Sequence, residues 1–160
     1  MKKEMYLVEV VNVVAWANQL TPEKLNKLNF KLRWALKKAL SKLVPDAQEF
    51  IKFRDGEVAA MRDKWFDDEH SVEYMEPGED NDGVVETTPM RKIKDEYMEV
   101  YQKEIDELND RINEILAEKN TYEYTSADVD DFVNSVDEIE PLEFQDLEIL
   151  DALLSDKGEA

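Results

Sequence analysis

Cysteine is missing from this chain of 160 residues, and histidine occurs once, as His70. Without cysteine the chain can form neither a disulfide framework nor a Cys-based zinc site. A single histidine also leaves out the paired imidazoles of most other zinc sites. These absences suit a reducing compartment and predict that no metal is bound.

The common catalytic and nucleotide-binding motifs are missing too. The chain contains no G-x-x-x-x-G-K-[ST], G-x-G-x-x-G, H-E-x-x-H or G-x-S-x-G segment. We therefore expect a protein that is not an enzyme and requires no cofactor.

Long uninterrupted apolar runs are lacking as well. The N-terminus, MKKEMYLVEVVNVVAWANQL, has the basic start and apolar stretch of a signal peptide, but Glu9, Asn12 and Asn18 interrupt it. No small-residue cleavage site follows, and the run is too polar to span a bilayer. We expect a soluble, intracellular protein without a membrane partner.

Positive charge is outnumbered by negative charge and is unevenly placed. Residues 1–64 hold 13 Lys/Arg against 8 Asp/Glu, and residues 65–160 hold 7 against 31, so +5 and −24 sum to the net charge of −19. The acidic surplus repels nucleic acid and anionic membranes, so no direct nucleic-acid binding is expected. It either serves solubility alone or marks docking onto a basic partner or head-to-tail self-assembly.

The first half of the chain has helical spacing. Residues 4–19 place polar side chains at helical intervals, although their valines also suit a strand, and helix or strand over 5–19 stays open. From Thr21 to Leu43 a leucine face alternates with lysines, with Thr21 as cap and Pro45 ending or kinking the helix. Asp46 then caps a further helical stretch.

The second half predicts a hairpin, a long helix and a short tail. Residues 71–88 suggest a β-hairpin with the turn PGEDND, and residues 88–120 suggest a helix of about 45 Å that Thr88 caps and Pro89 begins. Tyr122 and Tyr124 suit a short strand, and Leu-rich stretches after them suit short helices.

The predicted fold class is mainly α: an antiparallel long-helix hairpin or bundle with a small β-hairpin insertion and short C-terminal helices. The domain prediction is a helical core over 1–120, with its hairpin near 71–88, and an acidic C-terminal segment over 121–160 that packs on or extends from that core. The predicted core consists of Leu28, Leu32, Leu36, Leu40, Phe50, Val58, Met61, Ile105, Leu108 and Ile112.

Two acidic segments resemble metal sites only in part. With Gly83 at position 6 of a calcium loop, Asp80 and Asp82 take positions 3 and 5, but Gly78 and Pro89 stand where end ligands belong. A hairpin turn is therefore the preferred interpretation. His70 follows Asp67, Asp68 and Glu69, and such solvated acidic loops are common.

The candidate partner-binding residues are Arg33, Trp34, Lys37 and Lys38, with Asp128, Asp130 and Asp131. Trp34 lies off the leucine face and beside the cations, which forms a basic, aromatic patch suited to an acidic protein surface. The carboxylates of DVDDF sit near a predicted helix start, where the helix dipole favours them.

The order of segments resembles small proteins of a domain family of unknown function from tailed phages. The matching stretches are LNFKLRWALKKALSKL, EDNDGVV, YQKEIDELNDRINEIL and SADVDDFVNSVDEIEPLEFQDLEILDALL. The resemblance implies a phage or prophage protein that acts by binding, located in the virion or the host cytoplasm. That family supplies no catalytic residues to carry over.

Three functions follow as hypotheses. The first is a non-enzymatic virion structural or assembly component that binds protein or self-associates. The alternative is an acidic nucleic-acid mimic that inhibits a host DNA- or RNA-binding defence or transcription protein. The third, an enzyme, requires that acidic clusters converge in a deep pocket: Asp67, Asp68 and His70, or Asp128, Asp130 and Asp131.

Overall fold

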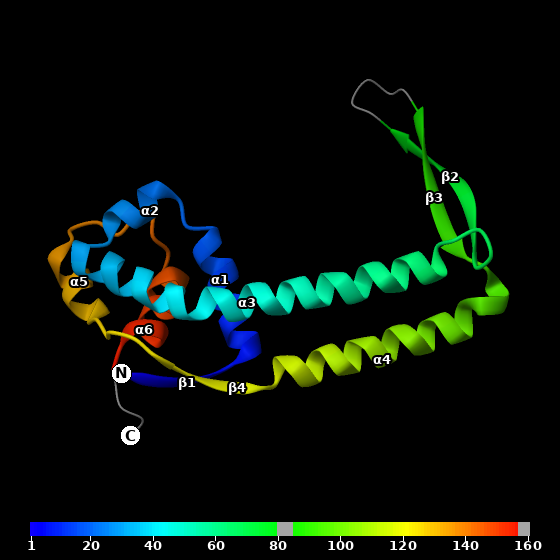
Figure 1. Cartoon of the computed structure of the whole chain (residues 1–160). Helices are drawn as coiled ribbons and strands as arrows, with labels where there is room; N and C mark the ends of the chain where they lie inside the picture. Colours follow the sequence, from blue (N-terminus) through cyan, green and yellow to red (C-terminus); the bar gives the residue numbers. More distant parts are fainter. Residues whose placement is uncertain (80–84, 157–160) are drawn as a thin grey trace. The chain divides into compact units, whose positions relative to one another are not determined.

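The computed structural model describes residues 1–79 and 85–156, and it describes side chains outside residues 75–89. The predicted turn PGEDND begins too early, because residues 77–79 belong to a paired strand, and its remaining residues 80–82, with the calcium-loop positions Asp80, Asp82 and Gly83, lie outside the described residues. The chain forms two compact units, a terminal unit of residues 1–50 and 115–160 and a central unit of residues 51–114. Figure 1 shows a mainly helical chain with two small antiparallel sheets, which confirms the predicted fold class.

A two-stranded sheet joins the two chain segments of the terminal unit. Strand β1 (Lys2–Tyr6) pairs antiparallel with β4 (Lys119–Glu123), and Lys2 faces Glu123 while Tyr6 faces Lys119. The opposite charges of Lys2 and Glu123 favour this register, and the Lys119 ammonium lies 4.8 Å from the Tyr6 ring centroid. The predicted strand around Tyr122 is confirmed.

The sequence left open whether residues 5–19 form a helix or a strand; they form the end of a strand followed by a helix. After β1, helix α1 runs over Leu7–Asn18, and the Tyr6 backbone N–H donates to the Glu9 carboxylate at 2.8 Å at its start. Val10 and Val14 are buried one turn apart. Burial of this apolar face outweighs the modest strand preference of valine.

The predicted helix over Thr21–Leu43 is wrong in its bounds, because it is two helices. Helix α2 (Pro22–Lys27) begins at the Thr21 cap and ends at Leu28, and α3 (Phe30–Trp65) follows. The Asn29 side chain accepts a hydrogen bond from the Leu32 N–H at 2.9 Å and caps α3.

Helix α3 also continues through Pro45, where the sequence predicted an end or a kink. Proline within a helix costs about 3 kcal/mol. Leu43 and Ala47, on either side, are both fully buried, and their packing offsets that cost. Asp46 is therefore a residue of the helix interior and not a cap.

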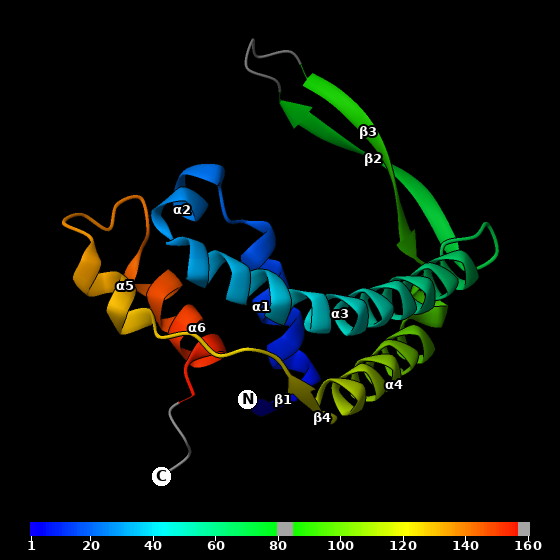
Figure 2. The same ribbon diagram turned by 60° about the vertical axis from the view of Figure 1, so that its left-hand side comes forward.

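The C-terminal helices provide much of the core of the terminal unit. Helix α5 (Val129–Ser135) buries Phe132, and α6 (Phe144–Leu154) buries Leu150, Leu153 and Leu154 to 2% exposure or less. In Figures 1 and 2, α6 lies beside the first part of α3, with α5 on one side of it and α1 on the other. Four predicted core residues of this unit are buried, Leu28, Leu32, Leu36 and Phe50, and Leu40 is half-buried.

The central unit pairs two antiparallel helices and carries a hairpin. The end of α3 is followed by β2 (Ser71–Glu79), β3 (Val85–Ile93), a 3-10 turn (Asp95–Tyr97) and α4 (Met98–Leu116). Strands β2 and β3 pair over nine residues each. The part of α3 after residue 50 lies antiparallel to α4 in both views (Figures 1 and 2), as predicted.

Two expectations for this unit are wrong. Thr88 and Pro89 do not begin the long helix, because they lie in β3, where pairing with β2 outweighs the local helix-start signal. Val58 is 39% exposed, whereas Leu108 is buried and Met61, Ile105 and Ile112 are half-buried. The core here centres on Trp65, Ile93 and Leu108.

Candidate protein-docking site

A groove runs between α2 and α3 in the terminal unit. Its volume is about 470 Å³, and mostly apolar atoms line it. Leu36 is 3% exposed, and Leu25 and Leu40 are half-buried. The break at residues 28–29 creates the groove, because it folds α2 back beside α3. The lining residues are Pro22, Leu25, Asn26, Arg33, Leu36, Lys37 and Leu40.

Two large aromatic side chains project beside this groove. Phe30 is 75% exposed and Trp34 is 48% exposed, one helical turn apart on α3. The ammonium groups of Lys38 and Lys37 lie 4.7 Å and 5.8 Å from the Trp34 ring centroid. Cation–π contacts of this kind contribute about 0.5–1 kcal/mol at exposed sites, so they hold the lysines near the ring.

The four predicted residues of the basic patch therefore lie together on α3. Arg33 and Lys37 line the groove, and Trp34 and Lys38 continue the surface around the helix. Neither Phe30 nor the groove is among the features predicted from the sequence. Phe30 was detectable, because it precedes Trp34 by four residues on the same helical side, but the groove depends on the turn between α2 and α3.

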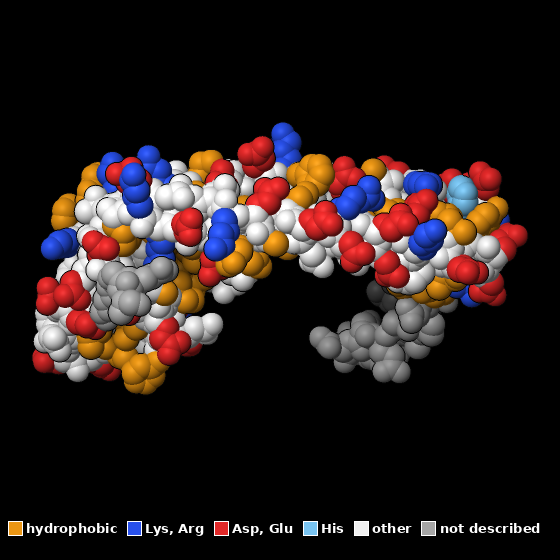
Figure 3. Space-filling model, turned by 90° about the horizontal axis from the view of Figure 1, so that it is seen from below, with side chains coloured by type: hydrophobic (Ala, Val, Ile, Leu, Met, Phe, Trp, Pro, Cys, Tyr) orange, Lys and Arg blue, Asp and Glu red, His pale blue; other side chains and the backbone are white. Residues whose placement is uncertain are grey.

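Positive charge is concentrated around the groove. Between Glu23 and Asp46 the chain has seven Lys/Arg and no acidic residue. Two of these cations reach inward, since the Lys24 ammonium lies 3.0 Å from Asp146 and that of Lys27 lies 3.2 Å from the Glu138 carbonyl. The other five are exposed, namely Lys31, Arg33, Lys37, Lys38 and Lys42. On the face drawn in Figure 3, acidic and basic side chains are interspersed.

The predicted acidic residues do not line the groove. Asp128 caps α5, accepting a hydrogen bond from the Asp130 N–H at 2.9 Å. Asp128 and Asp130 line a separate polar depression of about 370 Å³ together with Lys31, while Asp131 is exposed beyond it. A structural role as cap and first-turn carboxylates accounts for their position.

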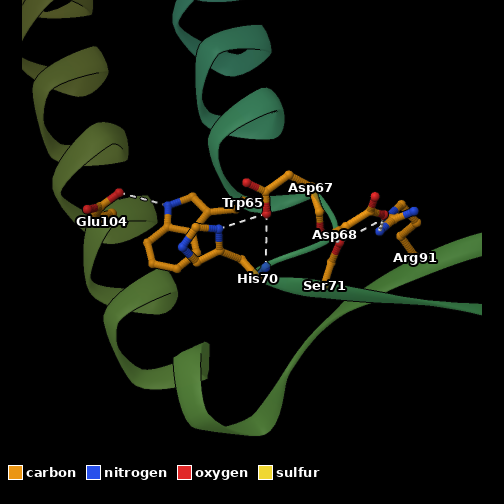
Figure 4. Close-up of polar contacts among 7 residues, drawn as sticks. All are labelled: Trp65, Asp67, Asp68, His70, Ser71, Arg91 and Glu104. Atoms are coloured by element: carbon orange, nitrogen blue, oxygen red, sulfur yellow. Dashed lines mark hydrogen bonds and ion pairs between the residues drawn. The ribbon is translucent and has the colours of Figure 1, made fainter.

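A second polar cluster lies in the central unit, where α3 meets the hairpin (Figure 4). The Asp67 carboxylate accepts a hydrogen bond from the His70 N–H at 2.9 Å and lies 2.7 Å from the His70 ring nitrogen Nδ1. Nearby, Arg91 donates to Asp68 at 2.7 Å and to Ser71 at 2.9 Å. These contacts join β3 to the loop that precedes β2 and to the first residue of β2.

Trp65 is the apolar centre of this cluster. Its ring lies at an angle to those of His70 and Tyr101, with centroids 5.0 and 5.8 Å away, and its indole N–H donates to Glu104 at 2.8 Å. Hydrogen bonds from the Lys64 ammonium and the Trp65 indole lower the pKa of Glu104. Hydrogen bonds from His70 likewise lower the pKa of Asp67.

Asp67, Glu69 and His70 are also the residues most suited to a metal ion in the part of the chain that the structure describes. One ligand atom from each lies within 4.8 Å of the others. Asp67 Oδ1 and His70 Nδ1 are already engaged with each other at 2.7 Å. The pairing and packing of His70 explain this cluster without a ligand.

No protein-family model matches this chain, and neither the curated proteins nor the solved structures contain a significant match to it. Among the described helices, none combines the length and apolar character needed to cross a bilayer.

Proposed function

We propose that this chain is a non-enzymatic phage protein that acts by binding other proteins, as a structural or assembly component of the virion. The observation that carries the proposal is the half-exposed Trp34 ring, which lies among cations beside an apolar groove. The phage context rests on the order and composition of the chain's segments, which resemble those of small tailed-phage proteins. It implies action in the virion or the host cytoplasm.

The chemistry of the surface supports protein binding. Tryptophan and arginine are enriched among the residues that dominate protein–protein affinity, and exposed apolar surface next to charged side chains is typical of docking sites. Phe30 and Trp34 are 75% and 48% exposed, so both rings are accessible to a partner. The groove supplies a concave apolar surface beside them.

The nucleic-acid mimic has less support. A mimic requires carboxylates aligned as a row of phosphates. On the face drawn in Figure 3, Asp and Glu side chains are interspersed with Lys and Arg. The mimic hypothesis predicts salt-sensitive binding to a DNA-binding protein that DNA competes away, and that assay separates the two functions.

The test is copurification of the tagged full-length protein from phage-infected cells, followed by mass spectrometry. We expect virion or assembly proteins to copurify with the wild type and to be lost with Trp34→Ala. Phe53→Ala is the matched control, because Phe53 lies on the same helix and is also 48% exposed. A strictly monomeric protein that is absent from virions and from assembly intermediates would contradict the proposal.

A further inference from the structure

We infer that the α2–α3 groove binds an acidic amphipathic helix presented by another protein. Apolar side chains of that helix enter the groove, and its carboxylates reach Arg33 and Lys37. The inference rests on the proposed function and adds the chemistry of the partner.

The shape of the groove suits a helix. On α3, residues 33, 36, 37 and 40 share one face, because successive residues of an α-helix turn by about 100°. Leu36 and Leu40 thus form an apolar row, with Arg33 and Lys37 beside it. A third helix that packs between α2 and α3 places residues at i, i+3, i+4 and i+7 against this row. A volume of about 470 Å³ accepts such anchor side chains.

The charge of the groove specifies an acidic helix. Lys24 and Lys27 turn toward the terminal unit itself, whereas Arg33 and Lys37 remain exposed at the groove. Lys31 and Lys38 extend the positive surface around α3, whereas Lys42 lies on the opposite side of the helix from Arg33, because nine residues make about two and a half turns. Carboxylates on the flanks of a docked helix therefore meet cations on the α3 side, which sets both association rate and orientation.

Two other occupants fit less well. Nucleic acid would gain stacking on Trp34 but nothing from the leucines that line the groove, and the chain outside residues 24–45 carries a charge of −26, from −19 minus +7. Two copies of the chain each carry a net charge of −19 and therefore repel one another. That repulsion opposes self-association.

The probe is a synthetic peptide of about 18 residues, with leucine at every third or fourth position and glutamate on the flanks. Its control has the same composition in an order that removes the leucine stripe. Binding to the full-length protein is measured by fluorescence polarisation at about 0.05 M and about 0.5 M salt. We expect the striped peptide to bind about tenfold or more tightly than its control.

Point variants locate the binding site. Leu25→Gln changes a half-buried lining residue and should weaken binding of the striped peptide about tenfold. Lys37→Glu should weaken it several-fold and reduce its salt dependence. Lys42 lies on the same helix but does not line the groove, so Lys42→Glu should leave the affinity for the striped peptide nearly unchanged. Circular dichroism establishes that each variant is folded.

Four outcomes would overturn the inference. They are no binding of the striped peptide, equal binding of both peptides, an equal effect of Lys37→Glu and Lys42→Glu, or tighter binding of a single-stranded DNA oligonucleotide than of the peptide. Sedimentation of the protein alone provides a fifth test, since self-association that Leu25→Gln abolishes would assign the groove to a second copy. If these tests fail while Trp34→Ala still removes virion proteins in copurification, the inference falls and the proposed function stands.

Discussion

The Trp16 indole N–H donates to the Asp146 carboxylate at 2.9 Å across 130 residues of sequence. The same carboxylate lies 3.0 Å from the Lys24 ammonium and accepts a hydrogen bond from the Glu143 N–H at 2.9 Å. Asp146 is only 5% exposed, so its charge is stabilised by these partners rather than by water. One buried acid therefore links α1, α2 and the start of α6.

Replacement of this acid should destabilise the terminal unit. Asp146→Asn keeps the size of the side chain but removes the charge that Lys24 neutralises, and we expect a loss of about 2 kcal/mol. Urea denaturation followed by circular dichroism measures it. Asp137→Asn, at an exposed position, is the control and should change stability by less than about 0.5 kcal/mol. Equal effects of the two variants would show that the contacts of Asp146 with Trp16, Lys24 and Glu143 do not contribute to the free energy of unfolding.

The same group predicts a dependence on pH. Burial alone would raise the pKa of Asp146, but hydrogen bonds from Glu143, Trp16 and Lys24 outweigh burial and lower it below the ordinary 3.8. The unfolded chain therefore takes up this proton first as pH falls, and stability is lost below about pH 4. The difference in unfolding free energy between wild type and Asp146→Asn should be full at pH 5–7. It should shrink at lower pH, and a difference that stays constant down to about pH 2 would contradict this assignment.

An alkaline transition should follow from Tyr122. Its hydroxyl donates to Asp46 at 2.6 Å, and burial together with this carboxylate raises the pKa of Tyr122 to about 12. The folded state favours the neutral phenol, so its stability declines as pH rises from about 10 toward 12. Asp46→Asn should lower the pKa of Tyr122 and leave that of Tyr124, which burial raises to about 12, unchanged. Phenolate absorbance measures both, and a parallel change in the two tyrosines would contradict the contact.

The C-terminal helix should be essential to the core although its sequence is acidic. Leu154 is fully buried, and Leu154→Ala should cost about 2–5 kcal/mol. Phe144 begins the same helix and is 78% exposed, so Phe144→Ala should change stability by less than about 0.5 kcal/mol. Thermal unfolding of the two variants compares them directly. A small loss for Leu154→Ala would show that α6 does not support the core.

Gly56 offers a stabilising substitution. It lies inside α3, and an added Cβ would meet no atom within 4 Å. Gly56→Ala should therefore stabilise the helix by about 0.5–1 kcal/mol, because alanine loses less backbone entropy on folding. Ala59→Gly, at an exposed position of the same helix, should have the opposite sign. Chemical denaturation measures both variants, and destabilisation by Gly56→Ala would indicate a required conformation at this position.

Local sequence patterns were sufficient for much of the fold. Thr21 and Pro22 mark the start of α2, and the spacing of Tyr101, Leu108 and Ile112 marks the buried side of α4. Patterns failed where contacts with other segments opposed a local signal. Pro45 signals a helix end, and Thr88 with Pro89 signals a helix start, yet tertiary packing and strand pairing override both.

The sequence alone determined the helical class, the hairpin, the charge division and the patch of Arg33, Trp34, Lys37 and Lys38, because each depends on residues close together along the chain. Only the tertiary structure revealed the groove, the pairing of β1 with β4 and the buried Asp146. Each of these depends on contacts between distant segments, and local periodicity carries no record of which distant partner a side chain meets.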